Sequence, residues 1–486
     1  MSSRTLPRSF PKKELLMSYK PLYHIFSDGA FLNDPNGLLY ENGQYHVFYQ
    51  WNPSYPGGKR VGWAHRCSTD LIHWTELPPA LLPDNWYDRC GCYSGSAVMK
   101  DGKIHLLYTG NVRDDGCERE TYQCLAASDD GEHFTKYAGN PLLSGPAAGY
   151  TAHFRDPKVF ADQNGYAFVL GAQTTDEHGR ALLYRSPDLL SWKLDGALQF
   201  DDPELDDFGY MWECPNLFEL PDAATLQKHA VLLFCPQGLK PWGMRFRNRY
   251  QCGYIVAPRT FNGTGAFIGG SAFEEIDRGF EFYAPQIFSA GKRTLMIGWM
   301  GMPEEEDQPS AQENWMHCLT VPRTVWMENR KLFQWPVEEL DGLHGEKQSI
   351  SLLPLENEAA KLPDFSGACY DMRLTFDTTR AQSLTLSLRQ SEQQEIRITF
   401  ADSVLRIDRS RSAYAPGDPV REVRLRHPEK LDLRILSDRS AMEIYVNGGE
   451  EVFSLRCYLE EDAVHTHVGI QGKAVLTKGE FYPMHA

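Results

Sequence analysis

The sequence predicts an all-β protein made of a five-bladed β-propeller followed by a C-terminal β-sandwich. One apolar strand recurs five times at intervals of roughly 60 residues, a period typical of propeller blades. A proline-led motif precedes four of these copies, and short alternating strands follow the last one. We therefore expect an N-terminal arm at residues 1–20, a propeller at 21–335, a linker at 336–345 and a sandwich at 346–486.

The recurring strand is a run of six mostly apolar residues. Gly, Asp, Asn and Pro turns separate it from its neighbours, and the pattern contains no long amphipathic helix. Five copies predict five blades of short strands around a central channel. The copies occupy residues 45–50, 104–109, 166–171, 230–235 and 293–298.

The proline-led motif places acidic residues at the start of the strand before the recurring one. Asp34 and Asp156 each directly precede a proline, and Glu213 stands two residues before another. The fourth copy, at residues 283–286, has no acid. Because the first strand of a propeller blade lines the central channel, the three acids are expected to meet there. They have no turn to cap at that place, so their position favours a chemical role.

A second repeat places an aspartate in a tight turn that is followed by an aromatic residue. Its copies contain Asp70, Asp130 and Asp188. A carboxylate in such a turn accepts backbone N–H groups while the ring packs beneath it. We interpret these three acids as structural.

Residues 346–486 predict an antiparallel sandwich. Apolar and polar residues alternate through segments 372–376, 384–388, 396–400 and 442–446, and Asn447-Gly448-Gly449 is a strong hairpin signal. Residues 334–340 predict a short connecting helix. Few chemically suggestive residues fall in this half, so we interpret it as a packing or oligomerisation module.

Composition narrows the class of function. The chain has 486 residues, 40 Gly, 30 Pro and a net charge of −16. This acidity disfavours nucleic acid and anionic membranes, which bind clustered Lys and Arg. No segment is apolar for long enough to span a bilayer, and the N-terminal segment lacks the apolar core of a signal peptide. We expect a monomer or a homodimer that binds neither nucleic acid nor membrane.

The 11 cysteines are scattered singly apart from Cys90-Gly91-Cys92. No CxxC pair occurs, and no His or Cys spacing suits zinc. We expect reduced, mostly buried thiols in a cytoplasmic protein.

Five motifs, in the right order, resemble those of glycoside hydrolase family 32, the family of invertases, fructanases and sucrose-6-phosphate hydrolases. The resemblance covers nearly the whole chain, and the five-bladed propeller and β-sandwich of the family agree with the repeat count. The motifs lie at residues 33–37, 93–97, 154–157, 212–216 and 279–286, and a further similar stretch spans 437–447.

The resemblance implies a retaining glycosidase that cleaves a β-fructofuranosyl bond without metal or cofactor. It implies that Asp34 is the nucleophile, Glu213 the general acid/base and Asp156 the stabiliser of the transition state. Retention requires two carboxyl groups about 5–5.5 Å apart, one ionised to attack and one protonated to assist the leaving group. Like-charge repulsion among crowded carboxylates raises the pKa of one of them, which would suit the acid role of Glu213.

The resemblance also implies a set of sugar-binding residues. Arg155 is expected to keep Asp156 ionised and to hold sugar hydroxyls, while aromatic rings stack on the sugar. The implied substrate-binding residues are Asn33, Gln50, Trp63, Tyr93, Ser94, Arg155, Glu281 and Trp299.

The chain departs from the family pattern at two places. Gly58 stands near the position where many invertases have a tryptophan that closes the site, and Glu281 stands where aspartate is usual. Two basic runs, one with Lys59 and Arg60 and the other with Arg245 and Arg247, suggest a phosphate site, unless they are solvated surface loops.

The leading substrate is sucrose-6-phosphate, followed by sucrose and short fructo-oligosaccharides. A non-catalytic sugar-binding propeller is disfavoured because all three acids are present. A sialidase-like enzyme is disfavoured because its arginine cluster and tyrosine nucleophile do not match the motifs here. The glycine run at 263–269 is a weak nucleotide-binding signal, since no helix follows it.

Overall fold

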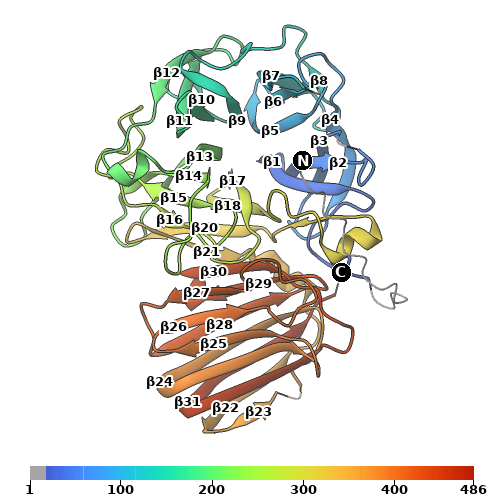
Figure 1. Ribbon diagram of the computed structural model, residues 1–486, viewed down its shortest axis with the longest axis vertical. Helices are drawn as coiled ribbons and strands as arrows, with labels where there is room; N and C mark the ends of the chain where they lie inside the picture. Colours follow the sequence, from blue (N-terminus) through green and yellow to red (C-terminus); the bar gives the residue numbers. More distant parts are fainter. Residues whose placement is uncertain (1–17, 59, 115, 363, 486) are drawn as a thin grey trace.

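The computed structural model describes residues 18–58, 60–114, 116–362 and 364–485, which fold into β-strands and short 3-10 helices with no α-helix (Figure 1). This confirms the predicted all-β class. Residues 1–17, most of the predicted arm, lie outside the described part. Residues 18–20 are held rather than loose, because Ser18 and Tyr19 donate hydrogen bonds to Glu313. The 3-10 helices are η1 (Pro203–Leu205), η2 (Pro309–Glu313), η3 (Glu338–Leu343) and η4 (Asn447–Gly449).

Five antiparallel sheets form the propeller, and each takes its strands in chain order. Blade 1 contains β1 (Phe31–Glu41), β2 (Gln44–Asn52), β3 (Gly62–Ser68) and β4 (Thr75–Leu81). Blade 2 contains β5 (Cys92–Lys100), β6 (Lys103–Val112), β7 (Glu120–Ser128) and β8 (Thr135–Lys136). Blade 3 contains β9 (Tyr150–Asp162), β10 (Gly165–Thr174), β11 (Gly179–Ser186) and β12 (Lys193–Ala197). Blade 4 contains β13 (Met211–Pro221), β14 (Lys228–Gln237), β15 (Gly253–Val256) and β16 (Glu274–Glu275). Blade 5 contains β17 (Tyr283–Ala290), β18 (Arg293–Met300), β19 (Cys318–Leu319), β20 (Arg323–Glu328) and β21 (Lys331–Pro336).

The recurring strand is the second strand of every blade. Its five copies fall within β2, β6, β10, β14 and β18, which confirms the repeat. The first strands β1, β5, β9, β13 and β17 surround the centre of the propeller and contact one another in a ring (Figure 1). The proline-led motifs therefore lie where the sequence predicted, on the innermost strands.

Each innermost strand carries a register shift at the same end. The shift falls at residues 33–34, 94, 156–157, 214–215 and 284–285. A proline stands at or next to this shift in four blades, and proline has no N–H to donate to the ladder. A bulge bends its strand and re-aims the side chains around it. The motif thus marks the points where side chains turn toward the channel.

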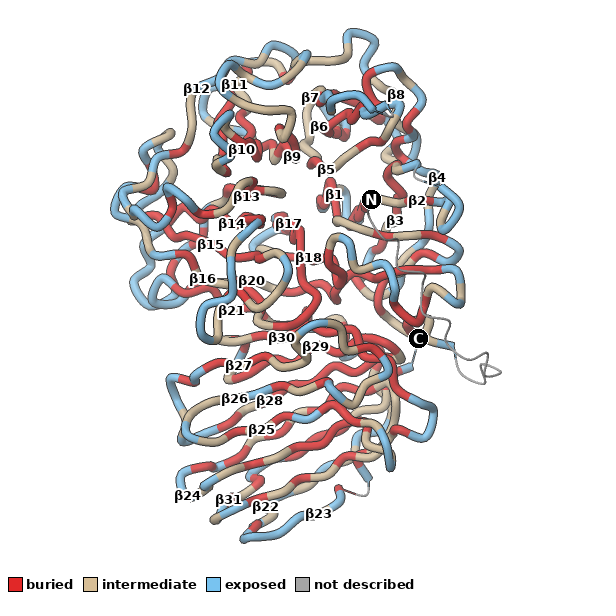
Figure 2. Tube along the Cα trace, in the orientation of Figure 1, coloured by how far each residue is buried: buried red, intermediate tan, exposed pale blue. Residues whose placement is uncertain are grey.

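Buried residues lie along the strands of every blade (Figure 2). Their apolar side chains cluster between neighbouring blades, so the core of the propeller is a set of layers instead of one centre. Phe48 of blade 1 packs with Leu106 of blade 2, and Leu107 of blade 2 packs with Phe168 of blade 3. The segment before β1 contacts blade 5, since Leu319 N donates to the Ile25 carbonyl over 2.8 Å, and β1 itself contacts blade 5 where Leu32 N donates to the Met316 carbonyl over 3.2 Å.

The C-terminal domain is one continuous sheet that curls on itself, which refines the predicted sandwich. Two long strands, β24 and β31, pair with each other. The shorter strands β25 and β28 pair with β24, while β22 and β23 pair with β31. The segments 372–376 and 384–388, which predicted separate strands, belong to the single strand β24. The strands are β22 (Gln348–Glu356), β23 (Ala359–Lys361), β24 (Tyr370–Gln390), β25 (Ile396–Ala401), β26 (Val404–Asp408), β27 (Val420–Arg424), β28 (Lys430–Ser437), β29 (Ala441–Val446), β30 (Glu451–Arg456) and β31 (His465–Pro483).

The connecting helix begins later than predicted, because residues 334–336 complete β21 and η3 follows at Glu338–Leu343. The two domains join through buried charges. Arg323 donates to Glu443 over 2.5 Å and to Asp277 over 3.0 Å, with all three side chains fully buried. His24 bridges Glu443 and Asp438 in the same junction. The polar C-terminal stretch 437–447 therefore serves domain docking.

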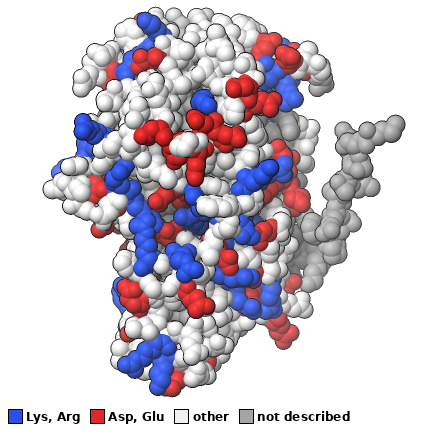
Figure 3. All heavy atoms as spheres, turned by 60° about the vertical axis from the view of Figure 1, so that its left-hand side comes forward, with Lys and Arg blue, Asp and Glu red and all other residues white. Residues whose placement is uncertain are grey.

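Charges on the surface are mixed in sign. On the face shown in Figure 3, acidic side chains gather on the upper half, and the basic side chains of the lower half lie between acidic ones. No helix in the described part of the chain is both long enough and apolar enough to cross a membrane.

Candidate active site

A cleft of about 730 Å³ opens at one end of the propeller channel. The second strands of the blades end there, so the loops that follow them form the rim. The cleft is lined by Phe31, Asn33, Asp34, Gln50, Asn52, Tyr55, Pro56, Gly57, Gly58, Val61, Tyr93, Arg119, Arg155, Asp156, Glu213, Tyr283, Trp299, Pro303, Glu304 and Glu306.

The three predicted acids meet in this cleft through Cys214. Its backbone N–H donates to Asp156 Oδ2 over 3.0 Å, and its Sγ lies 3.6 Å from Asp34 Oδ2. Glu213 directly precedes it in β13. Cys214 holds a left-handed backbone conformation, with φ 46°, at the bulge of this strand. One strained turn thus brings carboxylates from three blades together.

Asp34 is held by hydrogen bonds but is short of counter-charge. Ser94 Oγ donates to Asp34 Oδ2 over 2.5 Å, and Gln50 Nε2 donates to Ser94 Oγ over 2.6 Å. Burial, together with the charges of Asp156 and Glu213, raises the pKa of Asp34 to about 7, although the hydrogen bonds from Ser94 and Cys214 oppose the rise.

Asp156 also titrates above the usual range for aspartate. It has φ 67°, and its backbone N–H donates to Thr109 Oγ1 over 3.1 Å. Burial raises the pKa of Asp156 to about 6, although the Arg155 guanidinium, 4.0 Å away, opposes the rise. The expected effect of Arg155 on the pKa of Asp156 is therefore present, but burial raises this pKa by more than Arg155 lowers it.

Glu213 accepts four hydrogen bonds, two on each carboxylate oxygen. Arg155 Nη2 and Nε donate to Oε1 over 2.6 and 3.0 Å. Tyr283 Oη and Gln237 Nε2 each donate to Oε2 over 2.6 Å. The arrangement aims the carboxylate at the cleft and leaves it little freedom to rotate.

Most of the predicted sugar-binding residues lie at the cleft. Asn33, Gln50, Tyr93, Arg155 and Trp299 all line it. Trp299 Nε1 is buried and has no hydrogen-bond partner among the described residues. Ser94 is fully buried behind the cleft wall, where it donates a hydrogen bond to Asp34 instead of facing the cavity.

Two predicted sugar-binding residues lie elsewhere. Trp63 is fully buried between blades 1 and 2, and its Nε1 donates to the Tyr93 carbonyl over 3.2 Å. Glu281 is fully buried at the domain junction, where it accepts from Arg409 Nη1 over 2.7 Å and from the Arg456 backbone over 2.8 Å. These placements correct both predictions: Trp63 supports the wall under Tyr93, and Glu281 docks the C-terminal domain.

Of the residues in the two basic runs that the sequence suggested for phosphate, the three that the structure describes do not line the cleft. Arg245 donates to the Phe273 carbonyl over 2.7 Å, and Arg247 pairs with Asp418 of the C-terminal domain. Arg60 is exposed and does not line the cleft, and Lys59 lies outside the described residues.

Sequence reasoning missed Cys214, Gln237, Tyr283 and Arg119. Gln237 could have been found from strand alternation: Cys235 pairs with Glu213 across the ladder, and the residue two further along shares its face. Tyr283 is the first residue of the proline-led motif in β17. The fourth copy of the motif therefore contributes a hydrogen-bond donor to the site, where the other three contribute acids.

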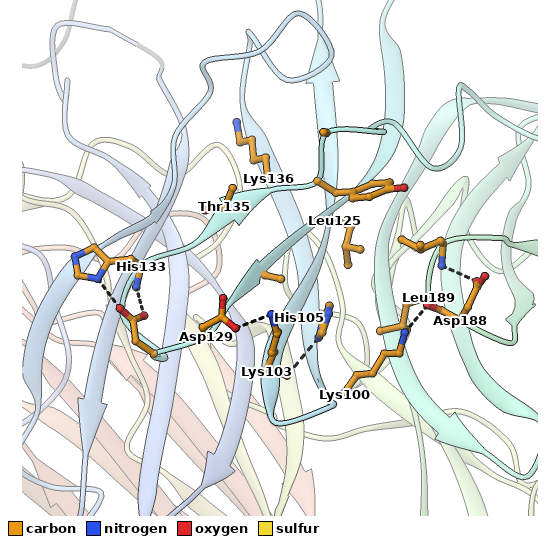
Figure 4. A pocket seen from close by; sticks show the side chains of 15 residues that line it. Lys100, Lys103, His105, Leu125, Asp129, His133, Thr135, Lys136, Asp188 and Leu189 are labelled. Carbon is orange, nitrogen blue, oxygen red and sulfur yellow. Dashed lines mark hydrogen bonds and ion pairs between the residues drawn. The ribbon is translucent and has the colours of Figure 1, made fainter.

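A second cavity, of about 690 Å³, lies at the opposite end of blades 2 and 3 and holds none of the predicted site residues (Figure 4). Its charged side chains form ion pairs with one another: Lys103 pairs with Asp129 over 2.6 Å, and His133 pairs with Asp130 over 2.9 Å. Oδ1 of both Asp130 and Asp188 accepts backbone N–H groups of its own turn. The structural interpretation of these turn acids is confirmed.

One group of metal-ligand side chains occurs among the described residues, namely Asp341, His344 and Asp371 near the linker. Arg373 contacts Asp341 over 2.6 Å, and Arg434 contacts Asp371 over 2.8 Å. Guanidinium groups therefore already neutralise these acids, and the group lies outside the cleft.

Comparison with known proteins gives a consistent result. Residues 24–336 match the glycosyl hydrolases family 32 N-terminal domain, and residues 339–483 match the family 32 C-terminal domain. A sucrose-6-phosphate hydrolase of Bacillus subtilis (strain 168) is 37% identical over 460 residues, covering 92% of this chain and 91% of that protein. One of Salmonella typhimurium is 39% identical over 452 residues, covering 92% and 90%.

Solved structures agree. A sucrose-6-phosphate hydrolase of Lactobacillus gasseri has a TM-score of 0.84 and 32% identity, with 96% of this chain and 93% of that chain covered. A β-fructofuranosidase of Bombyx mori in complex with sucrose has a TM-score of 0.80 and 30% identity, with 96% and 94% covered. The chain therefore belongs to glycoside hydrolase family 32.

Proposed function

We propose that the protein is a retaining β-fructofuranosidase that hydrolyses sucrose-6-phosphate and sucrose. The observation that carries this proposal is the convergence of Asp34, Asp156 and Glu213 around Cys214 at the floor of one cleft. Family membership and the names of the relatives from Bacillus subtilis and Salmonella typhimurium support the bond and the substrate.

In the first step the Asp34 carboxylate attacks the anomeric carbon of the fructosyl unit. Glu213 gives its proton to the glycosidic oxygen as the bond to that oxygen breaks, and the glucosyl product leaves. The four donors that hold Glu213 in place keep its carboxyl directed at that oxygen. Asp156 accepts fructosyl hydroxyls and stabilises the positive charge that develops on the ring.

In the second step Glu213, now a carboxylate, takes a proton from water. The water oxygen attacks the anomeric carbon, and the ester to Asp34 breaks to release fructose. Asn33 and the unpartnered Nε1 of Trp299 are placed to bind sugar hydroxyls during both steps. Two displacements at one carbon retain the anomeric configuration.

The substrate is tested by measuring kcat/KM for sucrose-6-phosphate, sucrose and 1-kestose with purified protein and no added metal. We expect sucrose-6-phosphate to be preferred over sucrose by about a hundredfold, which corresponds to about 2.7 kcal/mol of differential binding. Comparable constants for all three sugars would support a general fructosidase or fructo-oligosaccharide enzyme. Hydrolysis of none would support the non-catalytic sugar-binding alternative.

We place this activity in the cytoplasm. A phosphorylated sugar is an intracellular metabolite, and all eleven cysteines are free in the structure, as expected in a reducing compartment.

We expect kcat/KM to fall as the pH drops below neutrality, with an apparent pKa between about 6 and 7. Asp34 must be ionised to attack, and the pKa values of Asp34 and Asp156 are raised to about 7 and about 6. The two carboxyls interact, so the value belongs to the pair. The measurement is a pH profile from 4.5 to 8.5 at constant ionic strength.

Ser94→Ala provides a directed check on the same profile. It removes the hydrogen bond that lowers the pKa of Asp34, so the acid limb should move to higher pH. An acid limb that stays near pH 4 in the wild type, or one that Ser94→Ala does not move, would contradict the assignment to Asp34.

A further inference from the structure

The cleft is strongly acidic, which raises a problem for a phosphorylated substrate. Five carboxyl groups line it, those of Asp34, Asp156, Glu213, Glu304 and Glu306. A phosphate monoester carries close to two negative charges at neutral pH. The carboxylates of the cleft would repel this phosphate unless a cation near the leaving group offsets its negative charge.

Two cationic side chains line the cleft among the described residues, Arg119 and Arg155. Arg155 is already paired, because its Nε and Nη2 both donate to Glu213 and its Nη1 lies 3.0 Å from His153 Nδ1. The Nε of Arg119 is buried without a hydrogen-bond partner in the described part of the chain. A half-buried guanidinium with no ion pair to a described residue is a candidate for binding an anion, because arginine almost always pairs when it leaves water.

The described surroundings of Arg119 hold it in place without an ion pair. It ends the rim loop between β6 and β7, and its guanidinium lies 6.0 Å from the centre of the Tyr93 ring, which itself lines the cleft. Burial lowers the pKa of Arg119, and the positive charges of Arg155 and Arg113 lower it further. An anion at this point would relieve both the burial and the repulsion.

The position fits the leaving group. Glu213 protonates the oxygen that joins the two sugars, so the glucosyl unit must lie on the Glu213 side of the fructosyl unit. Arg119 is close enough to Glu213 and Arg155 to feel their charges. Its planar fork of N–H donors suits bidentate binding of a phosphate.

We propose that Arg119 binds the phosphate of a phosphorylated glucosyl leaving group and sets the preference for sucrose-6-phosphate over sucrose. The proposal rests on the proposed β-fructofuranosidase activity. It assigns the phosphate contact to the rim loop of blade 2, in place of the basic runs at Lys59 and Arg245 that the sequence suggested.

The test compares kcat/KM for sucrose-6-phosphate and sucrose in the wild type, Arg119→Gln, Arg119→Lys and Arg113→Gln. Arg119→Gln should lower the value for sucrose-6-phosphate by about 30-fold or more and change that for sucrose by less than about threefold. Arg119→Lys should retain part of the preference, because it keeps the charge but loses the fork.

Arg113→Gln is the matched control. It removes the same charge from the same loop, but Arg113 is exposed and does not line the cleft, so both constants should stay within about threefold of the wild type. Inhibition by glucose-6-phosphate is a second readout: Arg119→Gln should weaken it and leave inhibition by glucose unchanged.

The outcomes separate this inference from the proposed function. A wild type that hydrolyses neither sugar would overturn both. A wild type that hydrolyses sucrose without preferring the phosphate, or an Arg119→Gln variant that keeps the preference or loses both substrates equally, would overturn the inference alone.

Discussion

Asp34→Asn is expected to abolish hydrolysis of sucrose and sucrose-6-phosphate while the protein stays folded. The variant keeps the shape of the side chain and its contact with Ser94 but has no nucleophilic oxygen. Without the covalent step, kcat should fall by at least about 10⁴-fold. The measurement is initial rates on both sugars, together with thermal melting of the wild type and the variant.

The melting experiment has a predicted sign. Burial raises the pKa of Asp34 from 3.8 to about 7, so the ionised group destabilises the folded state relative to the unfolded one. This penalty is absent below about pH 3.8, grows as the pH rises and is complete above about pH 7. Asp34→Asn should therefore melt at a higher temperature than the wild type at pH 8, with a smaller difference at pH 5.

Asp70→Asn is the matched control for this prediction. Asp70 accepts backbone N–H groups of residues 72 and 73 in its turn, and its pKa is lowered to about 2. The same chemical change there should cost about 1 kcal/mol of stability and leave kcat/KM unchanged. If Asp34→Asn instead lowered the melting temperature at pH 8 and kept activity, Asp34 would be a structural residue.

Glu213→Gln is expected to slow substrates with poor leaving groups far more than activated ones. Loss of the proton donor should lower kcat/KM for sucrose by about 10³-fold. An activated donor such as 4-nitrophenyl β-fructofuranoside needs no proton on its leaving oxygen, so its kcat/KM should fall by less than about tenfold. Turnover should then be limited by hydrolysis of the fructosyl ester, because the general base is also missing.

Azide separates the two steps in this variant. As a nucleophile that needs no base, it should restore turnover of the activated donor and give fructosyl azide with retained configuration. Gln237→Ala is the control, because it removes one hydrogen-bond donor to Glu213 but keeps the carboxyl group. It should lower kcat/KM for sucrose and for the activated donor to a similar degree. Equal slowing of both substrates by Glu213→Gln would argue against its role as the acid.

The sequence predicts the positions of the acids well because they are tied to backbone geometry. A proline in an innermost strand imposes a bulge, and the bulge decides which side chains turn to the channel. Strand periodicity of about 60 residues then counts the blades. The turn aspartates such as Asp130 were predictable for the same reason, since their chemistry is local.

The residues that sequence reasoning misplaced depend on contacts between distant elements. Trp63 matches a sugar-binding position of the family, but its ring packs between two blades, and that contact forms only when the propeller is assembled. Glu281 accepts a hydrogen bond from Arg409 of the C-terminal domain, which lies 128 residues further along the chain. Arg119 carries no motif; its significance comes from Arg155 being already paired, which the sequence does not reveal.

The most direct test of the catalytic assignment is mass spectrometry of Glu213→Gln after brief reaction with 4-nitrophenyl β-fructofuranoside, acid quenching and peptic digestion. We expect one fructosyl unit attached to the peptide that contains Asp34, and none in the double variant that also carries Asp34→Asn. A fructosyl unit on another residue, or turnover to an anomerically inverted product with no adduct, would contradict it.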